Sequence, residues 1–109
     1  MKASDLFIKC LEEEGVTRIF GVPGEENADF MLSLKQSKIE FVLCRHEQAA
    51  AMAAHGYSRV TRKPGVTTAA SGPGTLNLLT GQYNAFIDCA PMITLGGAGP
   101  IKDFYRGGF

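Results

Sequence analysis

The stretch RHEQAAAMAAHGY, residues 45–57, joins a short apolar strand expected over 39–44 to a helix built largely of alanine. A helix with so little side-chain volume lets another backbone, a flat ligand or a second subunit come close. One acid, Glu47, stands where this helix begins, and a ligand group there could partly strip it of water. We expect Glu47 to handle a proton at a cofactor. The plain alternative is a helix N-terminal carboxylate stabilised by the helix dipole.

Outward from this stretch, short apolar runs alternate with segments of helical periodicity. Continuous apolar runs, rather than alternation of apolar and polar residues, are typical of parallel strands covered on both faces. The chain is therefore predicted to be an α/β protein with an open, mostly parallel sheet and helices on both faces, and the strand over 39–44 is expected to be fully buried. The expected strands cover 17–22, 39–44, 66–70 and 92–95, and the expected helices cover 4–14, 26–36, 47–62 and 75–88.

Each unusual loop follows a predicted strand. These loops are GVPGE (21–25), RHEQ (45–48), SGPG (71–74) and GGAGP (96–100). The carboxyl ends of parallel strands lie along one edge of the sheet, where ligands bind, so the four loops point to one crevice. Taken alone, each glycine loop is an ordinary turn. Pro73 has no N–H to offer a phosphate and no Walker-type lysine follows, which leaves dinucleotide binding as a weak alternative.

Composition excludes several classes of protein. The 109 residues suffice for one small domain, and a formal net charge of zero gives no electrostatic basis for binding nucleic acid or an acidic membrane surface. No apolar run approaches the roughly 18 residues of a membrane span. Cys10, Cys44 and Cys89 are far apart and in apolar contexts, so we expect buried thiols in a reducing compartment. Acids near the N-terminus do not fit a signal peptide, and a cytoplasmic location is expected.

Four segments together resemble a known family. FGVPGEEN (20–27), RHEQAAAMAAHGYSR (45–59), SGPGTLNLLTG (71–81) and YNAFIDCAPMITLGG (83–97) are similar to the N-terminal pyrimidine-binding domain of thiamine diphosphate enzymes. The acetolactate synthase-type branch is the most similar. The resemblance covers nearly the whole chain in the order and spacing of the family. One departure is Ala98, which follows Gly97 where that branch usually has glutamine.

The resemblance implies a role for individual residues. The glutamate matching Glu47 hydrogen-bonds the N1′ nitrogen of the cofactor's aminopyrimidine and promotes formation of the thiazolium ylid. Glu25 aligns with a catalytic aspartate of the pyruvate decarboxylase branch and, with Gly24, is expected in the substrate pocket. No metal ligand is expected in this chain. The expected cofactor-binding residues are Glu47, Pro23, Gly24, Gly72, Pro73 and Asn77.

The resemblance also implies a reaction and partners. It indicates the N-terminal part of a carboligase or decarboxylase that uses thiamine diphosphate on a 2-oxo acid such as pyruvate, within a homo-oligomer. We expect the chain to be truncated within its first domain, without the middle domain and without the diphosphate domain that binds Mg²⁺. The full-length enzyme could bind FAD, and the isolated fragment is expected to be inactive.

Two other interpretations stay open. The chain could be a non-catalytic module that pairs with a full-length relative, or a small nucleotide-binding α/β protein.

Overall fold

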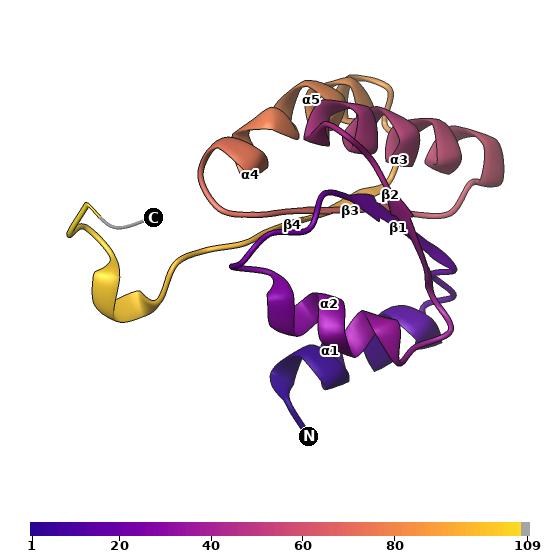
Figure 1. The fold of residues 1–109 in the computed structure, drawn as a ribbon. Coiled ribbons are helices and arrows are strands. Elements are labelled where there is room, and N and C mark those ends of the chain that lie inside the picture. The colour runs from indigo at the N-terminus through magenta and orange to yellow at the C-terminus, as the bar shows by residue number, and fades with distance from the viewer. Residues whose placement is uncertain (108–109) are drawn as a thin grey trace.

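A computed structural model describes residues 1–107, in which strands alternate with helices (Figure 1). No helix of this described part is both long and apolar enough to cross a membrane. The strands are β1 (Arg18–Gly21), β2 (Glu40–Leu43), β3 (Gly65–Ala69) and β4 (Met92–Gly96). The helices are α1 (Ala3–Glu13), α2 (Ala28–Lys35), α3 (Glu47–Thr61), α4 (Pro73–Asn77), α5 (Leu79–Ile87) and a short 3₁₀ turn, η1 (Ile101–Asp103).

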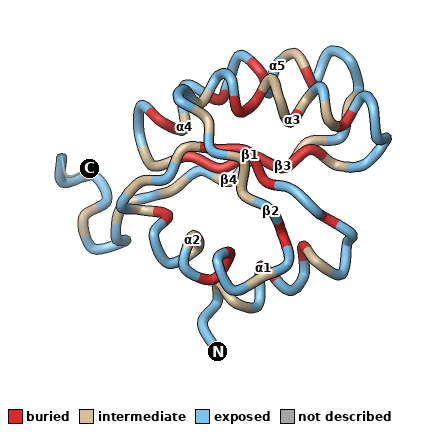
Figure 2. Tube along the Cα trace, turned by 45° about the vertical axis from the view of Figure 1, so that its right-hand side comes forward, coloured by how far each residue is buried: buried red, intermediate tan, exposed pale blue. Residues whose placement is uncertain are grey.

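The strands form one parallel sheet in the order β2-β1-β3-β4. Helices α1 and α2 cover one face, and α3, α4 and α5 cover the other (Figure 1). The predicted α/β sheet with helices on both faces is therefore confirmed. Burial follows the same layers, with buried residues along the inner strands and the sheet-facing sides of the helices (Figure 2).

The two inner strands differ from the edge strand β2 in burial. All five residues of β3 are buried, as expected for a strand covered on both faces. The expectation of a fully buried strand over 39–44 is wrong, because Glu40 and Leu43 are exposed and Phe41 and Val42 are only half-buried. This strand lies at the edge of the sheet, where one side has no neighbouring strand among the described residues.

The alanine helix permits close contacts on two sides. A Cβ added to Gly81 of α5 would overlap the methyl group of Ala51, and one added to Gly65 of β3 would overlap the carbonyl oxygen of Ala54. The expectation that α3 admits another backbone at short range is thus confirmed for both a helix and a strand. At the far end of the α3–α5 contact, Arg59 Nη1 lies 2.6 Å from Asp88 Oδ2.

The helix expected over 75–88 is interrupted. It consists of α4 and α5, which meet at Leu78, and the Leu78 N–H donates to the Thr75 carbonyl in a tighter turn. Leu78 itself is fully buried and packs with Ala51 and Ala69. One side of α4 and α5 is exposed, because the opposite side of α5, with Gly81 and Ala85, is the one that is buried. The exposed residues are Leu76, Leu79, Tyr83 and Phe86.

The three cysteines are not the buried thiols that were expected. Cys10 and Cys89 are exposed, and only Cys44 is half-buried; all three are free thiols. Cys10 lies on α1 next to the buried pair Ile8 and Leu11 but outside their face. Cys89 follows α5 in a left-handed conformation with φ of 52°, beyond the last packed turn. An apolar sequence context does not by itself say which side of a helix is covered.

The close contact between α3 and α5 predicts that replacing glycine with alanine has opposite effects on stability at two positions. Alanine at Gly81 must displace Ala51 and adjacent backbone, and we expect it to lower the free energy of unfolding by about 1–3 kcal/mol. Alanine at Gly56, in the interior of α3 with no atom near its added Cβ, should raise it by about 0.5–1 kcal/mol. Urea denaturation of both variants measures the difference. Equal stabilisation by the two substitutions would show that α3 and α5 are farther apart than described.

Candidate functional site

The loops that follow the four strands meet at the carboxyl edge of the sheet, as predicted. Their meeting point is the end of β3, at residues 69–71. The Gly97 N–H donates to the Ala69 carbonyl oxygen at 2.9 Å. A Cβ added to Gly24 would overlap the Ala70 methyl group, and one added to Gly74 would lie 3.6 Å from it. Three loops are therefore in contact at the end of one buried strand.

Glu47 is the first residue of α3 and is half-buried. The helix is capped by its neighbour His46, whose Nδ1 accepts a hydrogen bond from the Gln48 N–H at 3.0 Å. Because His46 serves as the N-cap, the Glu47 carboxylate is not needed for that bond. Its Oε2 instead accepts a hydrogen bond from Asn77 Nδ2 of α4 at 3.0 Å. The acid thus faces a second loop of the crevice.

The two carboxylate oxygens of Glu47 have different surroundings. Oε2 is held by Asn77, whereas Oε1 faces Gly74 and would be 3.3 Å from a Cβ added there. A side chain at residue 74 would crowd this oxygen. Glycine at this position therefore lets the turn lie close to the acid.

The SGPG turn is held from both ends. Gly72 has φ of 57° and ψ of −120°, a backbone conformation that residues with a Cβ rarely adopt. The Thr75 hydroxyl donates to the Ala70 carbonyl at 2.7 Å, and the Leu76 N–H donates to the Gly72 carbonyl at 3.0 Å. These bonds fix the path of the turn and with it the place of Gly74 beside Glu47.

The first loop is organised by Asn27, a residue that the sequence interpretation did not single out. Its side-chain oxygen accepts a hydrogen bond from the Gly24 N–H at 2.8 Å, and its amide nitrogen donates to Thr68 Oγ1 at 3.4 Å. The side chain is buried despite its polarity. The available signal was an asparagine near the start of the helix predicted over 26–36; in the structure this helix begins one residue after Asn27, at Ala28.

Glu26 was not among the predicted site residues. Its carboxylate lies near its own N–H and near the hydroxyl and N–H of Ser71, and these donors lower its pKa from the ordinary value of 4.5. The Ser71 hydroxyl oxygen is buried and has no hydrogen-bond partner among the described residues. A Cβ added to Gly97 would lie near both Glu26 Cβ and the Ser71 nitrogen, so the first loop and the start of the SGPG turn are close together.

The structure brings together only part of the predicted site. Glu47 and Asn77 are in direct contact, and Gly72 and Pro73 belong to the turn that ends at Gly74. Gly24 reaches this turn through Ala70. Pro23 and Glu25 are exposed on the first loop, and no hydrogen bond or ion pair within residues 1–107 joins either side chain to Glu47.

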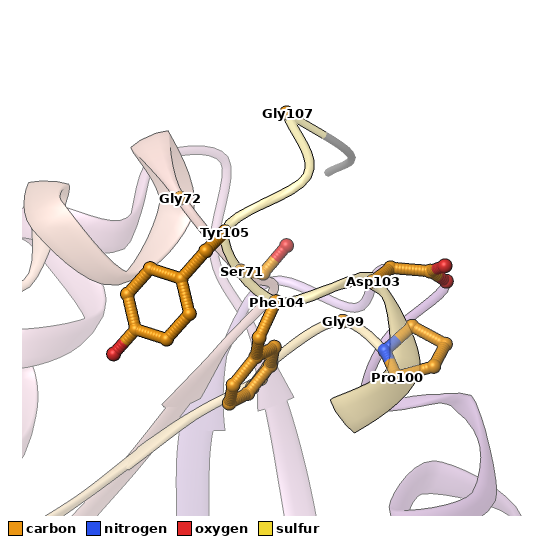
Figure 3. Close-up of a pocket in the computed structure, with 10 residues that line it drawn as sticks. Ser71, Gly72, Gly99, Pro100, Asp103, Phe104, Tyr105 and Gly107 are labelled. Atoms are coloured by element: carbon orange, nitrogen blue, oxygen red, sulfur yellow. The ribbon is translucent and has the colours of Figure 1, made fainter.

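A cavity of about 590 Å³ lies beside the SGPG turn. Ser71 and Gly72 form one wall, and the segment over 97–107 forms the other, with the Phe104 and Tyr105 rings near the turn (Figure 3). Glu47 does not line it, so the acid is at the neighbouring side of the same turn. Within residues 1–107, no group of three or more metal-binding side chains is close enough to hold an ion.

The family comparison matches the whole chain. Residues 1–109 match the model described as thiamine pyrophosphate enzyme, N-terminal TPP binding domain. This match includes the four segments on which the resemblance was based.

Curated relatives show the same similarity. A probable acetolactate synthase large subunit of Methanocaldococcus jannaschii is 46% identical over 102 residues, which are 94% of this chain and 17% of the relative. The acetolactate synthase isozyme 2 large subunit of Escherichia coli K12 is 42% identical over 97 residues, 89% of this chain and 18% of the relative. The chloroplastic acetolactate synthase of Arabidopsis thaliana is 39% identical over 102 residues, which are 93% of this chain and 15% of the relative.

The chain thus spans less than a fifth of the length of these relatives, and its match to them covers most of its own length. Together with the parallel sheet and the loops at its carboxyl edge, the match over residues 1–109 shows that the chain belongs to the family of thiamine pyrophosphate enzymes, as their N-terminal TPP-binding domain.

Proposed function

We propose that this chain binds the aminopyrimidine of thiamine diphosphate and that Glu47 is the residue that exchanges a proton with the ring. The protein containing it would be an acetolactate synthase-like carboligase or decarboxylase acting on a 2-oxo acid such as pyruvate. The observation that carries the proposal is the half-buried Glu47 carboxylate, which accepts a hydrogen bond from Asn77 at Oε2 and lies beside Gly74 at Oε1.

The residues present fit a flat heteroaromatic ring. Such a ring needs a hydrogen-bonding group at its edge, and the half-buried Glu47 carboxylate supplies one. Gly74, buried beside Oε1, brings main chain rather than a side chain to this part of the site. When bound, the cofactor supplies the electron sink for cleaving and forming bonds at the carbonyl carbon of the 2-oxo acid.

The work of the protein is to place and hold a proton. Glu47 would hold it at Oε1, since Oε2 is already engaged by Asn77. Asn77 donates and so favours the carboxylate orientation in which Oε1 faces the ring position. A carboxyl group used in this way must be within hydrogen-bonding reach of the ring atom that it serves.

The remaining site assignments belong to this proposal. Pro23, Gly24, Gly72 and Pro73 would line the cofactor, and Gly24 with Glu25 would lie toward the substrate. Mg²⁺ and the diphosphate would be held by a domain outside this chain, as would FAD if it is used. A second subunit would complete the site. The cytoplasmic location and the inactivity of the isolated chain also remain predictions.

One observation favours the alternative of a module that pairs with a full-length relative. Leu79, Tyr83 and Phe86 of α5 are 51%, 64% and 78% exposed, on a helix whose other side is packed. An apolar row of this kind is typical of a surface that a partner covers. Pairing and catalysis are not exclusive, and a catalytic test separates a competent domain from a module that only pairs.

Replacing Glu47 with Gln tests the proton role. The chain would replace the matching residues of the Methanocaldococcus jannaschii relative, with which it shares 46% identity over 102 residues. Because Gln keeps the shape but cannot accept the proton, we expect acetolactate formation to fall about 10²–10⁴-fold. Glu13→Gln, at an exposed position of α1, is the control and should leave the rate unchanged. Full activity of the Glu47→Gln chimera would remove the proposed role.

Removing the Asn77 amide tests whether this residue acts through Glu47. Asn77→Ala in the same chimera loses one hydrogen bond to the carboxylate, worth about 0.5–1.5 kcal/mol, so kcat should fall about 2- to 12-fold. The KM for pyruvate should change little, because the substrate is not contacted. Asn84→Ala on α5, whose amide faces Met52, is the matched control. An equal effect of the two substitutions on kcat would contradict an orienting role for Asn77.

A further inference from the structure

The loop that follows β1, residues 22–27, is attached at both ends to one residue of the inner strand β3. At its start, the Val22 N–H donates to the Thr68 carbonyl oxygen at 3.3 Å. At its end, the Asn27 side-chain amide donates to Thr68 Oγ1 at 3.4 Å. Between these points, the Gly24 N–H donates to Asn27 Oδ1 at 2.8 Å. The loop is therefore tied to β3 at both ends and braced across its middle.

The Asn27 side chain serves this loop and not the helix that it precedes. Asn27 is the N-cap of α2, a position where an asparagine side chain ordinarily accepts a hydrogen bond from one of the first N–H groups of the helix. It makes no such bond here. Its oxygen faces the Gly24 N–H, which is a donor, so the amide nitrogen is the atom that faces Thr68. The contacts to the loop and to β3 thus replace a helix cap.

The contact between Asn27 and Thr68 lies inside the protein. Asn27 is 6% exposed and Thr68 is 1% exposed, and a polar group buried to this degree costs stability unless it is hydrogen-bonded. The adjacent Thr67 provides a comparison, because its side chain points to the opposite face of the sheet and its buried hydroxyl has no partner among the described residues. The two neighbouring threonines therefore differ in one respect, the bond to the first loop.

We propose that Asn27 is a positioning residue that, through Thr68, fixes where Gly24 and Glu25 lie on the substrate side of the site. Glu25 is exposed, and its carbonyl oxygen accepts a hydrogen bond from the Ala28 N–H at 3.1 Å, so its main chain moves with the loop. Asn27 and Thr68 act through the loop and not on the reacting atoms. The consequence for a 2-oxo acid substrate rests on the proposed function, whereas the attachment of the loop to β3 does not.

Hydrogen exchange of the Gly24 amide, followed by NMR in the 109-residue chain, tests the attachment. Thr68→Val removes the hydroxyl that Asn27 reaches, keeps nearly the same shape, and leaves the bond between Gly24 and Asn27 in place. We expect exchange at Gly24 to become about 2- to 10-fold faster, as for the loss of one buried hydrogen bond. Thr67→Val is the matched control and should leave this exchange unchanged, because its hydroxyl bonds no described residue.

A second variant shows whether the two residues act together. Asn27→Ala removes both side-chain hydrogen bonds without removing a cap bond of α2, so exchange at Gly24 should rise at least as much as in Thr68→Val. Adding Thr68→Val to Asn27→Ala should then have little further effect, because the contact is already lost. Full, independent effects of the two substitutions would contradict a shared role.

The consequence for substrate is measured in the chimera with the Methanocaldococcus jannaschii relative. Thr68→Val should raise the KM for pyruvate about 2- to 10-fold and change kcat less than about twofold, because Glu47 lies on a different loop. Thr67→Val should change neither constant. Gly24 exchange that is the same in Thr68→Val as in the unmodified chain, or a KM that is unchanged in this variant, would overturn the proposal.

These experiments separate the inference from the proton role of Glu47. Exchange at Gly24 is measured without cofactor, and the expected change in KM is opposite in kind to the loss of kcat expected for Glu47→Gln. Full activity of the Glu47→Gln chimera would remove the proton role, while faster Gly24 exchange and a raised KM in Thr68→Val would still support the positioning role of Asn27.

Discussion

The structure depends on the absence of side-chain volume where segments of main chain approach one another around β3. Gly65 meets the Ala54 carbonyl, Gly81 of α5 meets Ala51, and Gly24 meets the Ala70 methyl group. At each of these contacts a single added carbon would overlap a neighbour. Close packing of this kind leaves few alternative arrangements, because interiors are packed as densely as organic crystals. The loops at the carboxyl edge are attached to these closely packed segments, so their positions are fixed by the same contacts.

Close packing around β3 also explains how Glu47 can be held in place although it is only half-buried. Glu47 is at the start of a helix that is capped by His46, so its carboxylate is free to bond Asn77 of α4. Helix α4 is short and begins at Pro73, within the SGPG turn, which is bonded to the end of β3 through Thr75. The geometry around the acid therefore derives from the buried centre of the sheet rather than from the exposed surface near it.

Much of this arrangement could be predicted from the sequence. Continuous apolar runs indicated parallel strands, and the loops after these strands were expected along one edge of the sheet, where the structure has them. The proton role of Glu47, predicted from its place between an apolar strand and an alanine helix, stays a prediction. Periodicity was less informative about what covers each face, so the exposed row on α4 and α5 and the exposed thiols of Cys10 and Cys89 were not foreseen. Contacts such as Asn27 to Thr68, 41 residues apart, have no local signature in the sequence.

Leu78 connects the hydrophobic core to the residue that bonds Glu47. It is fully buried against Ala51 and Ala69, and it follows Asn77 directly in the chain. Any loss of volume at this core position would let α4 shift, and the amide that meets Glu47 would shift with it. Under the role proposed for Glu47, a purely hydrophobic substitution at this buried position would lower activity as a substitution in the site itself would. Loss of activity would then not identify the substituted residue as one that contacts a ligand.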